Sequence, residues 1–249
     1  MDLTILGSSP ATENAGGACS GYLVSTGHTR LLVDCGHGVV SVLREVTELK
    51  ALSAILISHM HPDHFFDLVP LAYGFLFGKV PSIPLFLPPD GAQTLHDLAA
   101  AVRLPEGFFE RLFQISTYDP TASLRCGEVT ITFAHTRHAI PAYAMRFVHD
   151  GRALFYSSDT APDHRVAALM QDADVALVEA TAPLYSEDSD SATIHLDAPS
   201  AGRMAREAGV RALILTHTWY PVAAETLSLG GEAFGGPISL ARERSVYRV

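Results

Sequence analysis

The segment Ser58-His59-Met60-His61-Pro62-Asp63-His64 places four potential metal ligands within six residues. It follows a short apolar run, Ser53–Ser58, that predicts a buried strand, and its proline favours the first turn of a helix. The first two histidines alternate along an extended chain, so their side chains leave on the same face. The aspartate and the last histidine belong to the helix and point elsewhere. Imidazole and carboxylate are ligands that Zn²⁺ accepts, so the segment predicts two ligands for one metal ion and two for a second.

Three further candidate ligands follow apolar runs in the second part of the chain. His138, Asp159 and His217 each come within a few residues of the end of a predicted strand. Residues at the carboxyl ends of strands line one edge of a sheet. A carboxylate can bridge two cations, and Asp159 is the candidate for that bridge. His135 lies three residues before His138 and competes with it for the same role.

Apolar periodicity predicts strands with few helices in the first half, and alternating helices and strands in the second. The predicted strands are Asp2–Leu6, Gly21–Ser25, Arg30–Asp34, Ser53–Ser58, Val129–Phe133, Ala144–Val148, Ala153–Tyr156, Val175–Val178 and Ala212–Leu215, with an extended segment at Pro81–Pro89. The predicted helices are Gly38–Leu49, one after Pro62, Ala92–Val102, Asp163–Met170 and Pro199–Ala208. This pattern favours an α/β (α+β) fold in which two sheets pack face to face with helices outside, a four-layer αββα sandwich. We expect residues 1–249 to form a single domain, with Phe234–Val249 as a last strand segment.

The composition excludes several classes of protein. Apolar residues make up 48% and charged residues 18% of the 249 residues, which excludes a disordered chain. No apolar run is long enough for a membrane span, and the first residues lack the basic region of a secretory signal. The net charge of −10 weighs against a large nucleic-acid interface. The three cysteines, Cys19, Cys35 and Cys126, form no paired motif, so we expect a cytoplasmic protein.

The order His-x-His-x-Asp-His, then His138, Asp159 and His217, resembles the metallo-β-lactamase superfamily over essentially the whole chain. The residues after His138 resemble the third motif of that family, which favours it over His135. The resemblance implies the αββα fold, with metal ions at one sheet edge and Asp34 supporting them by hydrogen bonds. Carried over by position, the first metal would be held by His59, His61 and His138, and the second by Asp63, His64 and His217, with Asp159 as the bridge.

Two further segments narrow the resemblance to ribonuclease Z-like phosphodiesterases, some compact members of which act on cyclic nucleotides. Val178-Glu179-Ala180-Thr181 is similar to their Glu-Ala-Thr/Ser segment, and His195-Leu196-Asp197 before a helix looks like the same branch. The resemblance implies that His195 reaches the substrate phosphate and that Glu179 orients it. An opposite charge at Glu179 would raise the pKa of His195. The imidazolium could then stabilise developing charge or protonate the leaving alkoxide.

These residues lead us to expect a dinuclear metal-dependent hydrolase, a phosphodiesterase for a small phosphodiester (cyclic nucleotide) or an RNA 3′ end. Two divalent cations would lower the pKa of a shared water, giving a metal-bridging hydroxide that Asp63 steers. Zn²⁺ suits the ligands, and Mn²⁺ and iron stay open. The alternative is an acyl hydrolase (lactonase or thioesterase) with the same metal site, which has no need of His195 and Glu179. A non-catalytic metal-binding module is disfavoured, because no ligand is missing.

The sequence departs from the family pattern in two places. Family members often have Gly before the bridging aspartate, where this chain has Ser158. Ribonuclease Z carries a long arm that grips transfer RNA between the third histidine motif and the aspartate motif. Only 20 residues separate His138 from Asp159 here, so the arm is absent. We therefore expect a small-molecule phosphodiester as substrate in preference to transfer RNA, and no membrane partner. Whether the chain forms a homodimer stays open.

Overall fold

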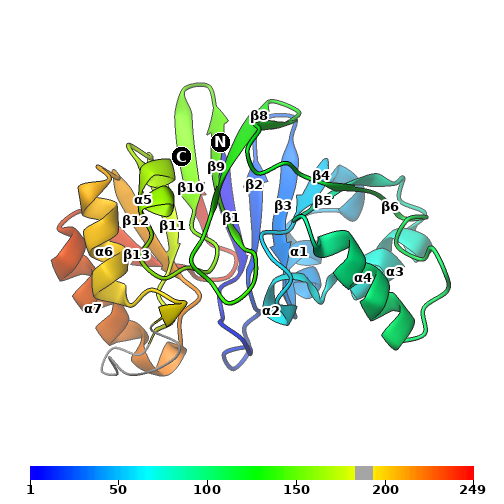
Figure 1. Ribbon diagram of the computed structural model, residues 1–249, viewed down its shortest axis with the longest axis horizontal. Coiled ribbons are helices and arrows are strands. Elements are labelled where there is room, and N and C mark those ends of the chain that lie inside the picture. The colour runs from blue at the N-terminus through cyan, green and yellow to red at the C-terminus, as the bar shows by residue number, and fades with distance from the viewer. Residues whose placement is uncertain (183–192) are drawn as a thin grey trace.

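The computed structural model describes residues 1–182 and 193–249. Within these ranges the chain forms two β-sheets packed face to face, with helices on the outer side of each (Figure 1). This is the four-layer αββα arrangement that the sequence predicts. No helix in the described ranges has the length and apolar character needed to cross a membrane.

The first sheet has the strand order β14-β1-β2-β3-β4-β5-β6 in the described part of the chain. Its strands are β1 (Asp2–Gly7), β2 (Gly21–Ser25), β3 (Arg30–Cys35), β4 (Ala54–Leu56), β5 (Ile83–Leu87), β6 (Phe113–Thr117) and β14 (Val246–Arg248). The helical elements of this half are α1 (Val39–Val46), η1 (Leu49–Ala51), α2 (Pro62–Phe65), α3 (Leu68–Gly78) and α4 (Gly91–Ala101). Strands β3 to β6 run parallel, so the chain leaves each of them at the same edge.

The second sheet has the order β13-β12-β11-β10-β9-β8-β7, again for the residues described. Its strands are β7 (Leu124–Cys126), β8 (Val129–His135), β9 (Tyr143–His149), β10 (Arg152–Tyr156), β11 (Val175–Glu179), β12 (Ala212–Thr216) and β13 (Ile238–Leu240). The helical elements are α5 (His164–Met170), α6 (Ala198–Glu207), η3 (Tyr220–Val222) and α7 (Ala223–Phe234). Strands β10 to β13 are parallel, so the segments that follow β10, β11 and β12 emerge together.

Successive residues of a strand enter different apolar cores. Leu31 packs between the two sheets, whereas Leu32 packs against the helices that cover the first sheet. Leu177 faces the first sheet, whereas Ala176 faces the helices of the second half. Both faces of the central strands are therefore buried, which explains why these strands appear in the sequence as continuous apolar runs.

Parts of the fold differ from the sequence prediction. The segment Phe234–Val249, expected as one strand, contains the end of α7 and two short strands that lie in different sheets. The predicted strand Ser53–Ser58 is shorter and covers only Ala54–Leu56. Helical spacing predicts that Phe75 and Phe77 pack in the core, yet Phe77 is 78% exposed. Because α3 is apolar on every side, periodicity cannot show which side faces the core.

Candidate metal centre

The segment after β4 forms one wall of the candidate site. His61 has an extended backbone and precedes α2, whose first turn contains Pro62. The rings of His59 and His61 lie edge to face with centroids 5.0 Å apart. Asp63 and His64 belong to the first turn of α2, and both side chains are buried. The local geometry thus gives two pairs of donor groups with different directions, as the alternation of the segment predicts.

Three segments from the second sheet bring further candidate ligands to the same place. His138 lies between β8 and β9, Asp159 follows β10, and His217 follows β12. One group, with ligand atoms within 4.8 Å of one another, contains His59, His61, His138 and Asp159. A second group within the same limit contains Asp63, His64, Asp159 and His217. The structure therefore brings together all seven residues that the sequence singled out, and Asp159 lies in both groups.

Several buried polar atoms of this cluster lack a hydrogen-bond partner among the described residues. They include His59 Nε2, His64 Nε2 and Asp159 Oδ1. His64 Nε2 is 3.3 Å from Asp159 Oδ1 without hydrogen-bond geometry, and His59 Nε2 is 3.8 Å from Asp159 Oδ2. Buried polar atoms without partners are costly, so their convergence fits cations that they would surround. Imidazole nitrogens and carboxylate oxygens suit Zn²⁺, Mn²⁺ or iron. The two groups thus fit a dinuclear metal site.

Protonation in the cluster also suits metal binding. Burial is the main cause that lowers the pKa values of His59, His61 and His138 and keeps a lone pair available. Burial opposes ionisation of Asp159, but the neighbouring histidines hold its pKa well below the usual range. His64 differs from these three histidines. Burial lowers its pKa, but Asp159 and other nearby carboxylates raise it by more, so the net shift is upward. A cation at this position would compete with the His64 proton.

Asp34, in β3, is the centre of a buried hydrogen-bond network. Its Oδ1 accepts the Ser58 N–H at 2.7 Å, and its Oδ2 accepts the Ser58 hydroxyl at 2.8 Å. Tyr156 also donates its hydroxyl to Oδ2 at 2.7 Å, and His64 Nδ1 lies 2.8 Å from the same oxygen. These bonds fix the His64 ring with Nε2 available on its other side. Asp34 is recognisable from the sequence, whereas the only signal for Tyr156 is an aromatic residue at the end of a strand before Asp159.

Two contacts that the sequence analysis missed orient the second group. Asp63 Oδ2 accepts the Ala11 N–H at 2.8 Å and lies 3.0 Å from His217 Nε2. The Thr181 hydroxyl donates to the His217 carbonyl oxygen at 2.7 Å and also contacts Nδ1 of that ring. Ala11 acts through its backbone amide, so its residue type carried no signal. Thr181 lies in the Glu-Ala-Thr segment, in which the sequence assigns a role to Glu179 alone.

His195 and Glu179 meet at the margin of the cluster. His195 Nδ1 is 2.9 Å from Glu179 Oε1, and Glu179 is buried at the end of β11. The same carboxylate accepts the backbone N–H groups of Thr160 and Thr181. Burial lowers the pKa of His195, but Glu179 outweighs it and raises the pKa to about 9. His195 is therefore held as an imidazolium, and its Nδ1 lies 4.0 Å from Asp159 Oδ2.

The remaining candidates lie outside the cluster. His135 is the last residue of β8, is exposed, and packs its ring against the edge of Tyr143. Its position leaves His138 as the histidine of this region that reaches the other donors. The three cysteines are buried and free, and none belongs to either group of donors.

Comparison with known proteins agrees with this geometry. A family model described as a beta-lactamase superfamily domain matches residues 29–218. The chain belongs to the metallo-β-lactamase superfamily. Members of this superfamily with a ribonuclease Z name are among its relatives, as the Glu-Ala-Thr and His-Leu-Asp segments predict.

Three similar proteins indicate where the chain stands within the superfamily. The probable metallo-hydrolase YhfI of Bacillus subtilis is 30% identical over 260 residues, covering 99% of both chains. The crystal structure of YhfI covers 99% of this chain and 98% of its own, with a TM-score of 0.86 and 28% identity. Ribonuclease Z of Mycolicibacterium gilvum is 27% identical over 241 residues, which are 87% of this chain and 84% of the relative. The short form of human tRNase Z has a TM-score of 0.79 with 20% identity, covering 100% of this chain and 99% of its own, and shows the shared fold. The chain is thus a metal-dependent hydrolase by family, with a donor cluster that fits two metal ions.

Proposed function

We propose that this chain is a dinuclear phosphodiesterase that hydrolyses a small phosphodiester, with a cyclic nucleotide as the first candidate and an RNA 3′ end as the second. The contact between His195 and Glu179 carries this proposal. A buried carboxylate that keeps an imidazole protonated supplies a positive donor for a phosphate oxygen or for a leaving alkoxide. The pair lies beside both donor groups, since the His195 ring is 5.0 Å from that of His138 and 5.9 Å from that of His217.

We propose the following division of the donors between two divalent cations. One cation would be held by His59, His61 and His138, and the other by Asp63, His64 and His217, with Asp159 shared by both. When bound, the cations would lower the pKa of a water and neutralise phosphate charge. The buried, unpaired nitrogens of His59 and His64 support this division. The imidazole-rich donor set favours Zn²⁺, and Mn²⁺ and iron are the comparison metals.

Side chains of this protein would then orient the reactants and move protons. Asp63 would accept a hydrogen bond from the attacking water, while the Ala11 amide holds Oδ2 of this carboxylate in place. The water would lose one proton to bulk solvent as its oxygen forms a bond to phosphorus, and the bond from phosphorus to the ester oxygen would break. His195 donates the proton that the leaving oxygen needs, from Nε2, because its Nδ1 faces Glu179. A cyclic diester would open to a monoester in this step.

The second sheet supports a small substrate over transfer RNA. The chain between His138 and Asp159 consists of β9, a tight turn at Asp150-Gly151 and β10. These elements pair with each other in the sheet and leave no length for an RNA-gripping arm. The net charge of −10 supports the same preference, because non-specific phosphate binding depends on Lys and Arg.

An activity panel separates this proposal from the acyl-hydrolase alternative. Zinc-loaded protein would be assayed with cyclic mononucleotides, a chromogenic phosphodiester, a short RNA and an acyl lactone. We expect turnover of at least one phosphodiester and its loss in a His195→Ala variant with unchanged metal content. His135→Ala is the matched control, because His135 is exposed and outside the cluster. Lactone turnover without phosphodiester turnover, unaffected by His195→Ala, would promote the acyl hydrolase.

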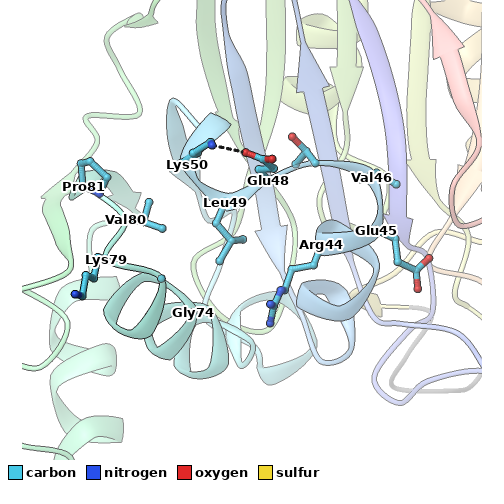
Figure 2. A pocket seen from close by; sticks show the side chains of 12 residues that line it. Arg44, Glu45, Val46, Glu48, Leu49, Lys50, Gly74, Lys79, Val80 and Pro81 are labelled. Carbon is cyan, nitrogen blue, oxygen red and sulfur yellow. Dashed lines mark ion pairs between the residues drawn. The ribbon is translucent and has the colours of Figure 1, made fainter.

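We also propose that the chain forms a homodimer through the outer face of α3. Tyr73, Leu76 and Phe77 are exposed there by 37%, 46% and 78%, and the rings of Tyr73 and Phe77 stack. A hollow of about 580 Å³ lies beside this face, between α3, η1 and the end of α1, where Leu49 points toward Gly74 (Figure 2). A contiguous apolar face of this kind marks an interface, and a two-fold contact would cover it on both copies.

Sedimentation velocity would test the homodimer. We expect Phe77→Glu to give a monomer at concentrations where the wild-type chain is a dimer. Val246→Glu is the matched control, because Val246 is 62% exposed on β14 and lies outside this face. A wild-type chain that stays monomeric at all concentrations would contradict the proposal.

We further propose that residues 1–249 form one domain in the cytoplasm. Asp2 in β1 is paired with Arg248 in β14, so segments that are far apart in the sequence share one sheet. Three buried cysteines that are all free support a reducing compartment. A single calorimetric unfolding transition would be expected for one domain, and two separate transitions would contradict it.

A further inference from the structure

Ser158, between β10 and Asp159, has an unusual backbone. Its φ angle is +52°, in the left-handed region, although it is not a glycine, and its side chain is fully buried. Left-handed backbone is unfavourable for an L-residue with a Cβ, and such residues gather at functional sites. Asp34 and His217, with φ angles of +57° and +53°, share this conformation in the same cluster. Three of the nine non-glycine residues with a positive φ in the described part of the chain thus lie in or beside the donor cluster.

The side chain of Ser158 makes a contact that a glycine could not make. Its Oγ lies 3.3 Å from Nδ1 of His59. A second hydroxyl, that of Ser58, is 3.1 Å from the same nitrogen, but Ser58 donates its proton to Asp34. Nε2 of His59, on the other side of the ring, has no partner among the described residues. Nδ1 of His59 is therefore enclosed by two hydroxyl oxygens while Nε2 faces Asp159.

This arrangement selects one form of the imidazole. A histidine that binds a metal through Nε2 carries its proton on Nδ1 and needs an acceptor there. The two hydroxyl oxygens, 3.1 and 3.3 Å from Nδ1, supply that acceptor. His59 has no backbone carbonyl or carboxylate hydrogen-bonded to Nδ1 in the described residues, so the hydroxyl pair carries this role alone.

We propose that Ser158 is a positioning residue of the metal centre, whose hydroxyl orients His59 for metal binding at the cost of a strained backbone. This inference rests on the dinuclear site of the proposed function. It explains why the position holds a serine although a glycine would relieve the strain. Removing the hydroxyl should then lower the affinity for the cation held by the donor group that contains His59. The affinity of the donor group that contains Asp63 should be nearly unchanged.

Zn²⁺ titration of the full chain against a chromophoric chelator tests the proposal. We expect Ser158→Gly and Ser158→Ala each to lower the affinity of one of the two Zn²⁺ sites by about 10-fold or more, the range for loss of a partner behind a ligand. The metal-free Ser158→Gly variant should keep its fold and gain about 1–3 °C in Tm, because glycine relieves the left-handed backbone. Ser158→Ala keeps the strain and lacks the hydroxyl, so it separates the two effects.

Two further variants make the result specific. Arg103→Gly is the matched control: Arg103 is exposed, has a φ angle of +56° and lies outside the cluster, so its change should raise Tm without altering Zn²⁺ affinity. In a His59→Ala background, Ser158→Gly should cause no further loss of Zn²⁺ affinity, because its effect acts through His59.

The outcomes distinguish this inference from the proposed function. Two Zn²⁺ sites in the wild type with unchanged affinities in both Ser158 variants would overturn the role of Ser158 and leave the dinuclear site standing. A full additional loss in the His59→Ala background would also overturn it. A wild-type chain that binds no Zn²⁺, Mn²⁺ or iron would overturn the dinuclear site and this inference together.

Discussion

The two halves of the molecule contribute to the donor cluster in different ways. The first half supplies four residues from one short segment after β4, where strand and helix geometry alone divide them into two pairs. The second half supplies His138, Asp159 and His217 from three separate segments, which meet only because β8 to β12 belong to one sheet. The first contribution is local and the second depends on the whole fold. Asp159 alone belongs to both groups of donors, so the difference between the halves should be measurable as one metal lost or two.

The largest effect is expected for Asp159→Ala. A residue shared by both groups serves both cations, so we expect the affinity for each to fall by more than about 100-fold, beyond the range seen for partners behind a ligand. Activity should fall with metal content. Elemental analysis after dialysis measures the effect, and Asp150→Ala, on the exposed hairpin turn, is the control. A variant that keeps two metals per chain would remove Asp159 from the bridge.

The double change His59→Ala and His61→Ala tests the local segment. Both residues belong to the same group, so we expect the chain to lose about one of two bound metals and keep the other at Asp63, His64 and His217. The same elemental analysis reads the outcome. Loss of both metals would mean that the two donor groups bind their metals only together. It would contradict the view that the local segment and the second sheet contribute separately.

Asp63→Ala separates positioning of the water from metal binding. Asp63 is held by the Ala11 amide, and we propose that it orients the attacking water. We expect kcat to fall by about 10²–10⁴, the range for a general acid or base, with a smaller loss of metal. Turnover at the wild-type rate would show that the reaction takes place elsewhere.

His195→Ala should change the leaving-group dependence. On a phosphodiester with a poor leaving group we expect kcat to fall by about 10²–10⁴, and by less on a chromogenic diester whose phenolate leaves unaided. Metal content should stay constant. Equal losses on both substrates would indicate that His195 binds phosphate and does not donate a proton.

The pH profile gives a second view of the same pair. Because Glu179 raises the pKa of His195 from 6.5 to about 9, the required imidazolium is present below that pH, and kcat should fall as pH rises through about 9. The contact also stabilises the fold fully below pH 6.5 and loses this effect as pH rises through about 9. In Glu179→Gln the fall in kcat should move to lower pH. An unmoved profile would contradict the role of Glu179.

The smallest effect is expected for Tyr156→Phe. Asp34 loses one of its donors but keeps the two bonds from Ser58 and the contact with His64. We expect the free energy of unfolding to fall by about 1.5–3 kcal/mol, the range for a hydrogen bond to a charged group. Tyr247→Phe is the control, because its hydroxyl donates to the neutral carbonyl oxygen of Leu240 and should cost about 1 kcal/mol. Urea denaturation measures the effect. Equal losses of unfolding free energy in the two variants would show that the hydrogen bond to Asp34 stabilises the fold no more than a bond to a neutral carbonyl.

The sequence predicts the central part of the fold because both faces of those strands are buried. Continuous apolar runs such as the one in β11 therefore stand out. The edge strand β6 has one buried residue, Phe113, and polar residues such as Gln114, so its sequence carries no such signal. Phe77 shows the opposite error. Its apolar side chain predicts burial, but it is exposed, because α3 has more apolar surface than the rest of this chain covers.

How much of the site could be predicted depends on the kind of chemical group. The donors are imidazole and carboxylate side chains, so the His and Asp residues of the cluster are visible in the sequence. The groups that orient them are a tyrosine hydroxyl, a backbone amide at Ala11 and the Thr181 hydroxyl, which are common groups whose role depends on tertiary contacts. Ser158 is visible in the sequence as a departure from the family pattern, but its contact with His59 depends on the folded geometry.

The most direct test of the central claim is X-ray diffraction from crystals of the zinc-loaded protein, with anomalous data collected on both sides of the zinc absorption edge. Two anomalous peaks are expected. One should lie among His59, His61 and His138, and the other among Asp63, His64 and His217, with Asp159 between them. A single peak among Glu179, His195 and His217, whose ligand atoms also lie within 4.8 Å of one another, or no peak at all, would contradict the account.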